Sequence, residues 1–177
     1  MRFISLAASL LLLVTIARGE DPATFPVGAF TFARPTTWSW VPVTSPMRKA
    51  ELKVPGADAS QFGDITFFHF GAGQGGDIQA NTQRWLRQFD SKPGTEKTAS
   101  LDAGSTKITL VTTEGTFHSG MPGGPTTSVP DQALLGAILE NPEGNVFVKM
   151  TGPIALVNAT RQQFIDFVTA AAATAKK

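Results

Sequence analysis

The stretch from Gly63 to Phe89 constrains the fold most, because it carries the patterns of a strand, a glycine turn and a helix without interruption. Aromatic and β-branched residues occupy both alternating faces of Asp64 to Phe70, which is typical of a strand that is covered on both sides inside a sheet. The segment Gly71 to Gly76 then holds four glycines, which adopt positive φ without steric cost. A tight turn is therefore expected directly after a central strand.

Apolar side chains recur at helical spacing after this turn. Ile78, Trp85 and Phe89 fall on one stripe, whereas glutamines and arginines take the opposite side. Asp77 stands where an N-cap residue accepts hydrogen bonds from the first helical N–H groups. The pattern predicts an amphipathic helix from Asp77 to Phe89 that lies on the sheet, with Trp85 as its anchor in the core.

The glycine segment also matches a cofactor-binding fingerprint. Gly71, Gly73 and Gly76 satisfy G-x-G-x-x-G, and Glu96 follows near the expected distance for a ribose-binding carboxylate. A long segment precedes the strand, however, and no further strand–helix crossovers follow it. We interpret the glycines as a structural turn and expect no cofactor.

The chain starts with the pattern of a secretion signal. Met1-Arg2 is a short basic stretch, residues 3–16 form an apolar run that is short for a bilayer span, and small residues follow at positions 17 and 19. We expect a signal peptide at 1–19 and a single domain at 20–177. Since the chain has no cysteine, it has neither a disulfide nor a cysteine for lipid attachment, and we expect an exported protein of the periplasm or the cell exterior.

The net charge of the chain argues against some classes of binding partner. The chain has 15 lysines and arginines and 14 acidic residues, and loss of Arg2 and Arg18 with the signal peptide leaves 13 against 14, a net charge of about −1. A chain so balanced shows no basic patch for nucleic acid or anionic lipid. We expect no nucleic-acid partner and no membrane insertion after cleavage.

Alternating apolar residues predict further strands, and the end of the chain predicts a second helix. Pro153 stands near the first position of that helix, and its apolar stripe includes Val157, Phe164 and Val168. The polar, proline-bearing start of the mature chain, 20–27, is typical of a flexible lead-in. The additional strands are expected at 30–33, 38–43, 47–54, 95–101, 106–117, 133–140 and 146–150.

Two segments are candidates for binding. The stretch from His118 to Pro130 has no hydrophobic period and is rich in glycine, proline and serine, which predicts a long loop, and long loops in small domains are often functional. Trp38 and Trp40 face the same way in a short strand, where they form a stacking platform for a sugar, fill the core or cover a sheet edge. The candidate binding residues are Met121, Pro122, Gly123, Gly124, Pro125, Trp38 and Trp40.

Several phrases resemble a known family. FTFARPTTW at Phe30 to Trp38 is similar to the opening of PsbP-like domains, and SPMRKAELKVP, FHFGAGQGGDIQANTQRW and MPGGP resemble an uncharacterised group of exported bacterial proteins with that fold. The resemblance implies an α+β fold in which two helices pack on an antiparallel sheet of about six to seven strands, a PsbP-like α/β sandwich. It also implies a protein that docks onto other proteins.

Residues for common catalytic mechanisms are scarce. There is no cysteine nucleophile, no tyrosine and no G-x-S-x-G motif, and His69 and His118 are the only histidines. Glu114 lies on the same strand face as His118 but apart from it, so we expect no metal site. Ser119 is adjacent to His118 and points away from it in an extended strand.

Two hypotheses on function follow. In the first, the chain is an exported, non-catalytic binding or accessory module for a protein or a small molecule. In the second, it is an enzyme of an unrecognised class that uses His69 or His118.

Overall fold

The computed structural model describes residues 21–58, 60–120 and 125–175, so the expected signal peptide lies outside the described residues. The described chain forms ten strands and two helices. Their bounds are β1 (Thr24–Val27), β2 (Phe30–Ala33), β3 (Ser39–Trp40), β4 (Arg48–Pro55), β5 (Phe62–His69), α1 (Ile78–Leu86), β6 (Phe89–Ser91), β7 (Lys97–Ala103), β8 (Thr106–Ser119), β9 (Thr127–Leu139), β10 (Val146–Pro153) and α2 (Ile154–Ala172).

The main sheet confirms the predicted α+β class. Its order is β3-β4-β5-β10-β9-β8-β6, with β7 also paired to β8, and each of its ladders is antiparallel. The described strands number eight in this sheet, more than the six to seven expected. Part of the excess is β6, which begins at Phe89, a residue that was expected to end the first helix.

The start of the described chain was also predicted incorrectly. Thr24–Val27 is not a flexible lead-in but strand β1, which forms a separate hairpin with β2 across Gly28. Phe25 and Val27 alternate with exposed neighbours and are buried. Burial of these two side chains outweighs the polar, proline-bearing composition of the segment.

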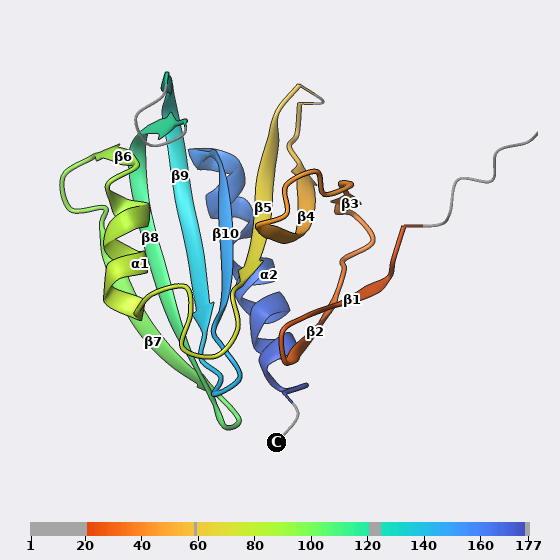
Figure 1. The fold of residues 1–177 in the computed structure, drawn as a ribbon. Coiled ribbons are helices and arrows are strands. Elements are labelled where there is room, and N and C mark those ends of the chain that lie inside the picture. The colour runs from red at the N-terminus through yellow and green to blue at the C-terminus, as the bar shows by residue number, and fades with distance from the viewer. Residues whose placement is uncertain (1–20, 59, 121–124, 176–177) are drawn as a thin grey trace, which may run out of the picture.

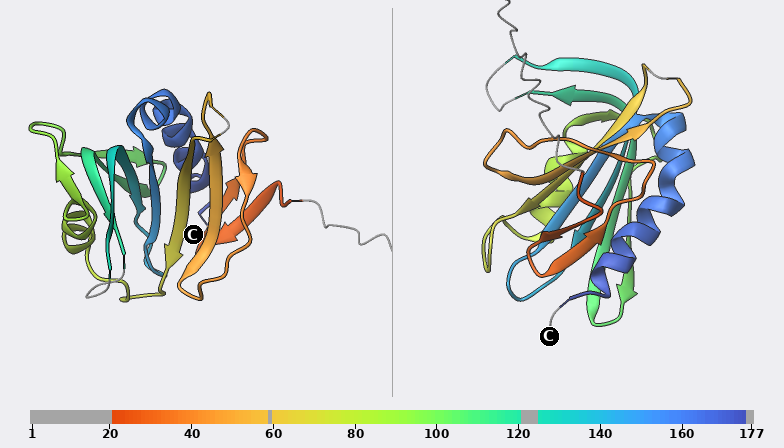
Figure 2. Two further views of the ribbon diagram at one scale, coloured as in Figure 1. Left: turned by 90° about the horizontal axis from the view of Figure 1, so that it is seen from above. Right: turned by 90° about the vertical axis from the view of Figure 1, so that its right-hand side faces the viewer.

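One face of the main sheet is covered by α2 together with the β1–β2 hairpin. The ring of Phe67 on β5 meets Phe25 and Phe32 at centroid distances of 5.2 and 5.1 Å, and Phe167 of α2 meets Phe32 at 5.3 Å. The larger hydrophobic core lies in this layer. Figure 2 shows α2 and α1 on different sides of the sheet.

Of the two described helices, α1 alone lies on the opposite face. Trp85 lies on β9 at Gly136, where a Cβ atom would overlap the indole ring, and the ring is buried together with Leu134, Ile138 and Phe147. This contact confirms the predicted burial of Trp85. Because α1 is only nine residues long, it covers β8 and β9 and leaves the same face of β4 and β5 without a helix (Figure 1).

The strand, turn and helix of the central stretch are confirmed, with altered bounds. β5 lies between β4 and β10 as a central strand, and the glycines at 71, 73, 75 and 76 all have positive φ. Asp77 caps α1 and accepts a hydrogen bond of 2.6 Å from the N–H of Ala80. The helix ends at Leu86 because Phe89 pairs with Phe117 and packs its ring on that of Phe117 at 5.0 Å.

The antiparallel neighbours of β5 argue against a dinucleotide-binding unit, which needs parallel strands joined by a crossover helix. The turn therefore keeps its structural interpretation.

The predicted long loop at 118–130 is largely wrong. His118 and Ser119 belong to β8 and pair with Ser128 and Thr127 of β9, so only 120–126 separates the two strands. Pro130 is accommodated because the register shifts beside it, at Asp131, which has a φ of 54°. The candidate binding residues Met121 to Gly124 lie outside the described residues.

We expect Trp85→Ala to lower the free energy of unfolding by about 3–5 kcal/mol, because a large buried aromatic side chain is lost over a glycine that cannot fill the space. Gln83→Ala, on the exposed side of the same helix, is the matched control and should change stability by less than about 0.5 kcal/mol. Urea unfolding followed by circular dichroism measures both variants. A loss below 1 kcal/mol for Trp85→Ala would contradict its role as the anchor of α1.

Candidate functional site

The part of the sheet that α1 leaves uncovered is the candidate functional surface. Along β5, the buried Ile65 and Phe67 alternate with Asp64, Thr66 and Phe68, which are only partly buried. The register places Lys149 of β10 beside Thr66 on this face. We refer to the side chains of β4, β5 and β10 on the α1 side as the open face.

Exposed apolar side chains lie on this face and at its borders. The large hydrophobic residues exposed within the described ranges are Met47, Phe62, Phe70 and Val129, and Met47 is the most exposed at 61 %. Met47 and Phe70 line one concave site, and Phe62 and Val129 line another. Apolar groups gathered in concave sites mark contact surfaces more often than scattered ones do.

The first site, which we name the α1 cleft, lies between α1, β5 and β10. Its volume is about 190 Å³. Its apolar lining consists of Met47, Phe68, Phe70, Trp85 and Phe147, and its polar lining of Asn81, Arg84, Gln88 and Lys149. A cleft with aromatic walls and a few polar groups is the usual form of a small-ligand site.

Lys149 is the least expected residue of the cleft, because it stands in an otherwise apolar strand. Its Nζ donates a hydrogen bond to Oε1 of Gln88 and lies 4.9 Å from the centroid of the Phe117 ring. Within the described residues it forms no ion pair with a carboxylate. Burial, with a smaller effect from the positive charge of Arg48, lowers the pKa of Lys149 from 10.5 to about 8.

The other charged side chains around Lys149 form contacts with neighbouring residues. Arg48 pairs with Glu51 at 2.7 Å. Arg84 donates to Oδ1 of Asn81 at 2.9 Å, and the amide nitrogen of Asn81 donates to the carbonyl of Gly75 at 2.8 Å. Among the residues that the structure describes, the lining of the α1 cleft thus holds two cations and no carboxylate.

Gln88 is held in place by its backbone. Its carbonyl oxygen accepts a hydrogen bond of 2.7 Å from the N–H of His118, and its own N–H donates to the carbonyl of Trp85 at 3.1 Å. The short connection between α1 and β6 therefore fixes Gln88, whose side chain is the acceptor of Lys149, relative to the sheet.

A second concave site lies further along the open face and includes Phe62, Asp64, Phe117 and Val129. Burial raises the pKa of Asp64, although the positive charge of Lys53 opposes the shift. The Nζ of Lys53 lies 3.7 Å from the centroid of the Phe62 ring. This end of the face holds both signs of charge and does not favour a ligand of one sign.

The stacking platform predicted from Trp38 and Trp40 is wrong. Trp38 is 1 % exposed, and its ring meets Phe167 of α2 at 5.1 Å. Trp40 is half-buried, with its ring 5.1 Å from Phe25. The alternative interpretation, in which the tryptophans fill the core, holds because Trp38 packs on α2 and Trp40 packs on the β1–β2 hairpin. Only Ser39 and Trp40 of the expected strand 38–43 pair with β4.

Pro125 is the one candidate loop residue that the structure describes, and it is exposed. The binding role of Met121 to Pro125 stays a prediction.

The structure does not bring the two histidines together. His69 pairs with Val146 in a row that continues through Leu139 to Ile108, and His118 lies ten residues beyond Ile108 on β8. Nδ1 of His69 lies 3.4 Å from the carbonyl oxygen of Asn145. No group of three potential metal ligands occurs in the described ranges.

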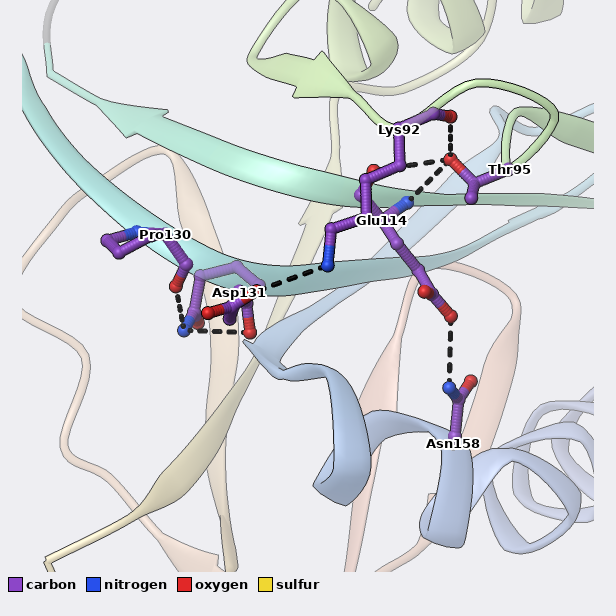
Figure 3. Close-up of polar contacts among 7 residues, drawn as sticks. Lys92, Thr95, Glu114, Pro130, Asp131 and Asn158 are labelled. Atoms are coloured by element: carbon purple, nitrogen blue, oxygen red, sulfur yellow. Dashed lines mark hydrogen bonds and ion pairs between the residues drawn. The ribbon is translucent and has the colours of Figure 1, made fainter.

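Glu114 has a structural role at the junction of β8 and α2. Its carboxylate accepts a hydrogen bond of 3.0 Å from the side-chain amide of Asn158, and its N–H donates to the hydroxyl of Thr95 at 3.2 Å. Figure 3 shows these contacts beside the ion pair of Lys92 with Asp131, 3.1 Å long. Glu114 therefore ties the sheet to the second helix.

His118 instead belongs to a row of three polar side chains. Its Nδ1 lies 2.9 Å from the hydroxyl of Ser128, and its Nε2 lies 2.9 Å from Oδ2 of Asp90. Sequence analysis missed this row because the three residues come from three strands. Serine hydrolases bond the serine to Nε2 and the carboxylate to Nδ1, so here the two nitrogens are exchanged.

Comparison with known proteins finds no matching family model and no matching curated protein. Among solved structures, the chain is similar to the solution structure of cyanobacterial PsbP (CyanoP) from Synechocystis sp. PCC 6803, with a TM-score of 0.53 over 89 % of this chain and 96 % of that one. The fold is PsbP-like. At 8 % sequence identity the similarity concerns the fold alone.

The PsbP-like fold agrees with the resemblance noted in the sequence. Neither described helix combines the length and the hydropathy needed to cross a membrane. Within this fold, the short α1 and the uncovered strands beside it provide the α1 cleft.

The lowered pKa of Lys149 predicts a rise in stability with pH. Below about pH 8 the ammonium is present in both the folded and the unfolded chain, so the fold bears the full cost of its burial. Between about pH 8 and 10.5 the folded protein releases this proton while the unfolded chain retains it, and the free energy of unfolding rises. Allowing for partial exposure, we expect a rise on the order of 1–2 kcal/mol.

Urea unfolding at several values between pH 7 and 10.5 measures this rise. In Lys149→Met the rise should be absent, and the variant should be more stable than the wild type at pH 7 because no buried charge remains. Lys107→Met, at an exposed site, is the control and should retain the wild-type profile. Equal profiles for wild type and Lys149→Met would contradict the burial of the ammonium.

Proposed function

We propose that the chain is an exported, non-catalytic binding or accessory module and that the α1 cleft, with the open face around it, is its binding site. One observation supports this proposal most: exposed apolar side chains line the same cleft as a lysine that has no carboxylate partner among the described residues. Stability explains neither feature, since apolar side chains that stay exposed add nothing to the free energy of unfolding and an unpaired buried cation lowers it. A bound partner or ligand would cover the apolar side chains and pair the cation.

The size of the cleft limits its occupant. Pockets for drug-sized ligands measure about 300–1,000 Å³, whereas the α1 cleft measures about 190 Å³. It fits a small molecule or a single side chain of a partner protein, and the open face would then contact the rest of such a partner.

The segment from Met121 to Pro125 remains part of the proposal, because it follows directly on β8 and precedes β9, the two strands that lie beneath α1. The cleft and this segment are separate candidate surfaces that separate variants can test.

The alternative, an enzyme that uses His69 or His118, is favoured only by the row Ser128–His118–Asp90. The side chain of Asp90 is 79 % exposed, so water competes for its carboxylate and weakens any effect on the imidazole. Ser128 lines neither concave site of the open face. A serine outside a substrate site has no means of positioning a substrate.

We expect the cleft variant Met47→Ser/Phe70→Ser to lose partner or ligand capture from the envelope fraction of the source cell, because its apolar contacts are removed. The matched control, Ala155→Ser/Ala159→Ser, changes two exposed residues on α2 and should capture as the wild type does. Mass spectrometry of proteins and of extracted small molecules measures capture. Full capture by the cleft variant would contradict a binding site in the cleft.

The same assay tests the segment at 121–125. Its replacement by a Gly-Ser linker should leave stability nearly unchanged, since a change of loop length costs only ~0.6 kcal/mol per doubling. If the segment docks a partner protein, capture of that protein is lost while small-molecule capture remains. Unchanged protein capture would remove the segment from the proposal.

The enzymatic alternative predicts that Ser128 is a nucleophile. We expect Ser128→Ala and the wild type to hydrolyse p-nitrophenyl acetate at the same rate, because exposed imidazoles react with this ester without a serine. His118→Ala serves as the control for that background. A fall of 100-fold or more in Ser128→Ala would establish the alternative and contradict a non-catalytic module.

A further inference from the structure

We infer that the α1 cleft binds a small organic acid, whose carboxylate pairs with Lys149 and whose flat apolar body lies against the aromatic walls. The inference rests on the proposed function and names the ligand class for that same site.

Lys149 has hydrogen-bonding capacity left for a ligand. An ammonium group has three N–H donors and no acceptor, and one of them is satisfied by Oε1 of Gln88. The face of the Phe117 ring offers a weaker contact on another side. At least one donor therefore remains for a group inside the cleft, and the strongest acceptor for it is an anion.

The charges around the cleft are mainly positive. Arg84 shares the lining with Lys149, and Arg48 lies close enough to affect it. Glu51 is paired with Arg48, so it is not directed at the ammonium. The cleft is thus an electropositive recess, which is complementary to a ligand with one negative charge.

The walls of the α1 cleft are aromatic. Phe147 meets Trp85 at a centroid distance of 6.5 Å and Phe70 at 6.1 Å, and Phe70 stacks with Phe68 at 6.4 Å. These rings form a continuous aromatic lining that passes from α1 to β5 and ends beside Lys149. Aromatic rings accept flat apolar bodies through offset stacking and edge contacts.

The size and shape of the cleft favour a free ligand over a protein segment. The cleft is hollowed between a helix and a sheet and has a volume of about 190 Å³, which suits a body of one or two rings better than an extended chain. Lys149 is partly buried, whereas Met47 and Phe70 of the same lining are exposed, which favours a carboxylate that can enter with its own ring system.

Isothermal titration calorimetry with three probes of one shape tests the inference. The probes are 2-naphthoate, 2-naphthalenemethanol and 2-naphthylmethylammonium, which carry a negative, a neutral and a positive head on the same rings. We expect the wild type to bind naphthoate at least tenfold more tightly than the alcohol, with the ammonium compound weakest. Quenching of Trp85 fluorescence, absent in Trp85→Phe, places the probe in the cleft.

Two variants assign the preference to Lys149. In Lys149→Met the preference for naphthoate should vanish while the alcohol still binds, which also shows that the variant is folded. Lys53→Met is the matched control, since Lys53 lies on the same face against Phe62 and outside the cleft, and it should retain the preference. Equal binding of the three probes by the wild type, or a preference that survives in Lys149→Met, would overturn the inference.

The failures of the two proposals are distinguishable. If no probe binds but the cleft variant loses capture from the envelope fraction, the organic-acid inference is overturned and the binding module stands. If capture is identical for wild type and cleft variant and no probe binds, both are overturned.

Discussion

The contact between Trp85 and Gly136 is the interaction on which the rest of this structure depends. It lays a short helix onto one side of an antiparallel sheet, and the size of the indole ring means that a single residue supplies much of the apolar contact of α1. Because that helix is short, it covers β8 and β9 and leaves the adjoining strands open. The α1 cleft exists at the boundary between the covered and the uncovered part of the sheet.

Lys149 lies at this boundary and shows a conflict between stability and binding. A methionine or leucine there would suit the strand and remove the cost of a buried ammonium, whereas a cation with donors to spare suits a ligand of opposite charge. Sites that reduce the stability of a fold are commonly the sites where it acts. The aromatic walls beside Lys149 supply the apolar half of the same recognition.

The sequence predicts some residues of the candidate site and misses others. The helical stripe predicts the burial of Trp85 but not its second role as a wall of the cleft, since that role depends on Phe70 and Phe147 from distant segments of the chain. Lys149 is not among the candidate site residues predicted from the sequence, although a charged residue inside the apolar run VFVKM is unusual and can indicate a functional position. Trp38 is a binding candidate in the sequence because aromatic pairs suit both cores and ligand sites, and only its packing on Phe167 of α2 distinguishes the two.

By itself, the sequence determined the features that depend on neighbouring residues: the strand at β5, the glycine turn, the Asp77 cap, the amphipathic α1 and the second helix. Local periodicity and backbone preference act over a few residues, so they can be read without the fold. The tertiary structure alone decided that 24–27 pairs as a strand, that β8 and β9 continue past His118 and Ser128, and that Arg84, Phe70 and Lys149 share one cleft. These features arise from contacts between distant segments, whose burial and register no local pattern specifies.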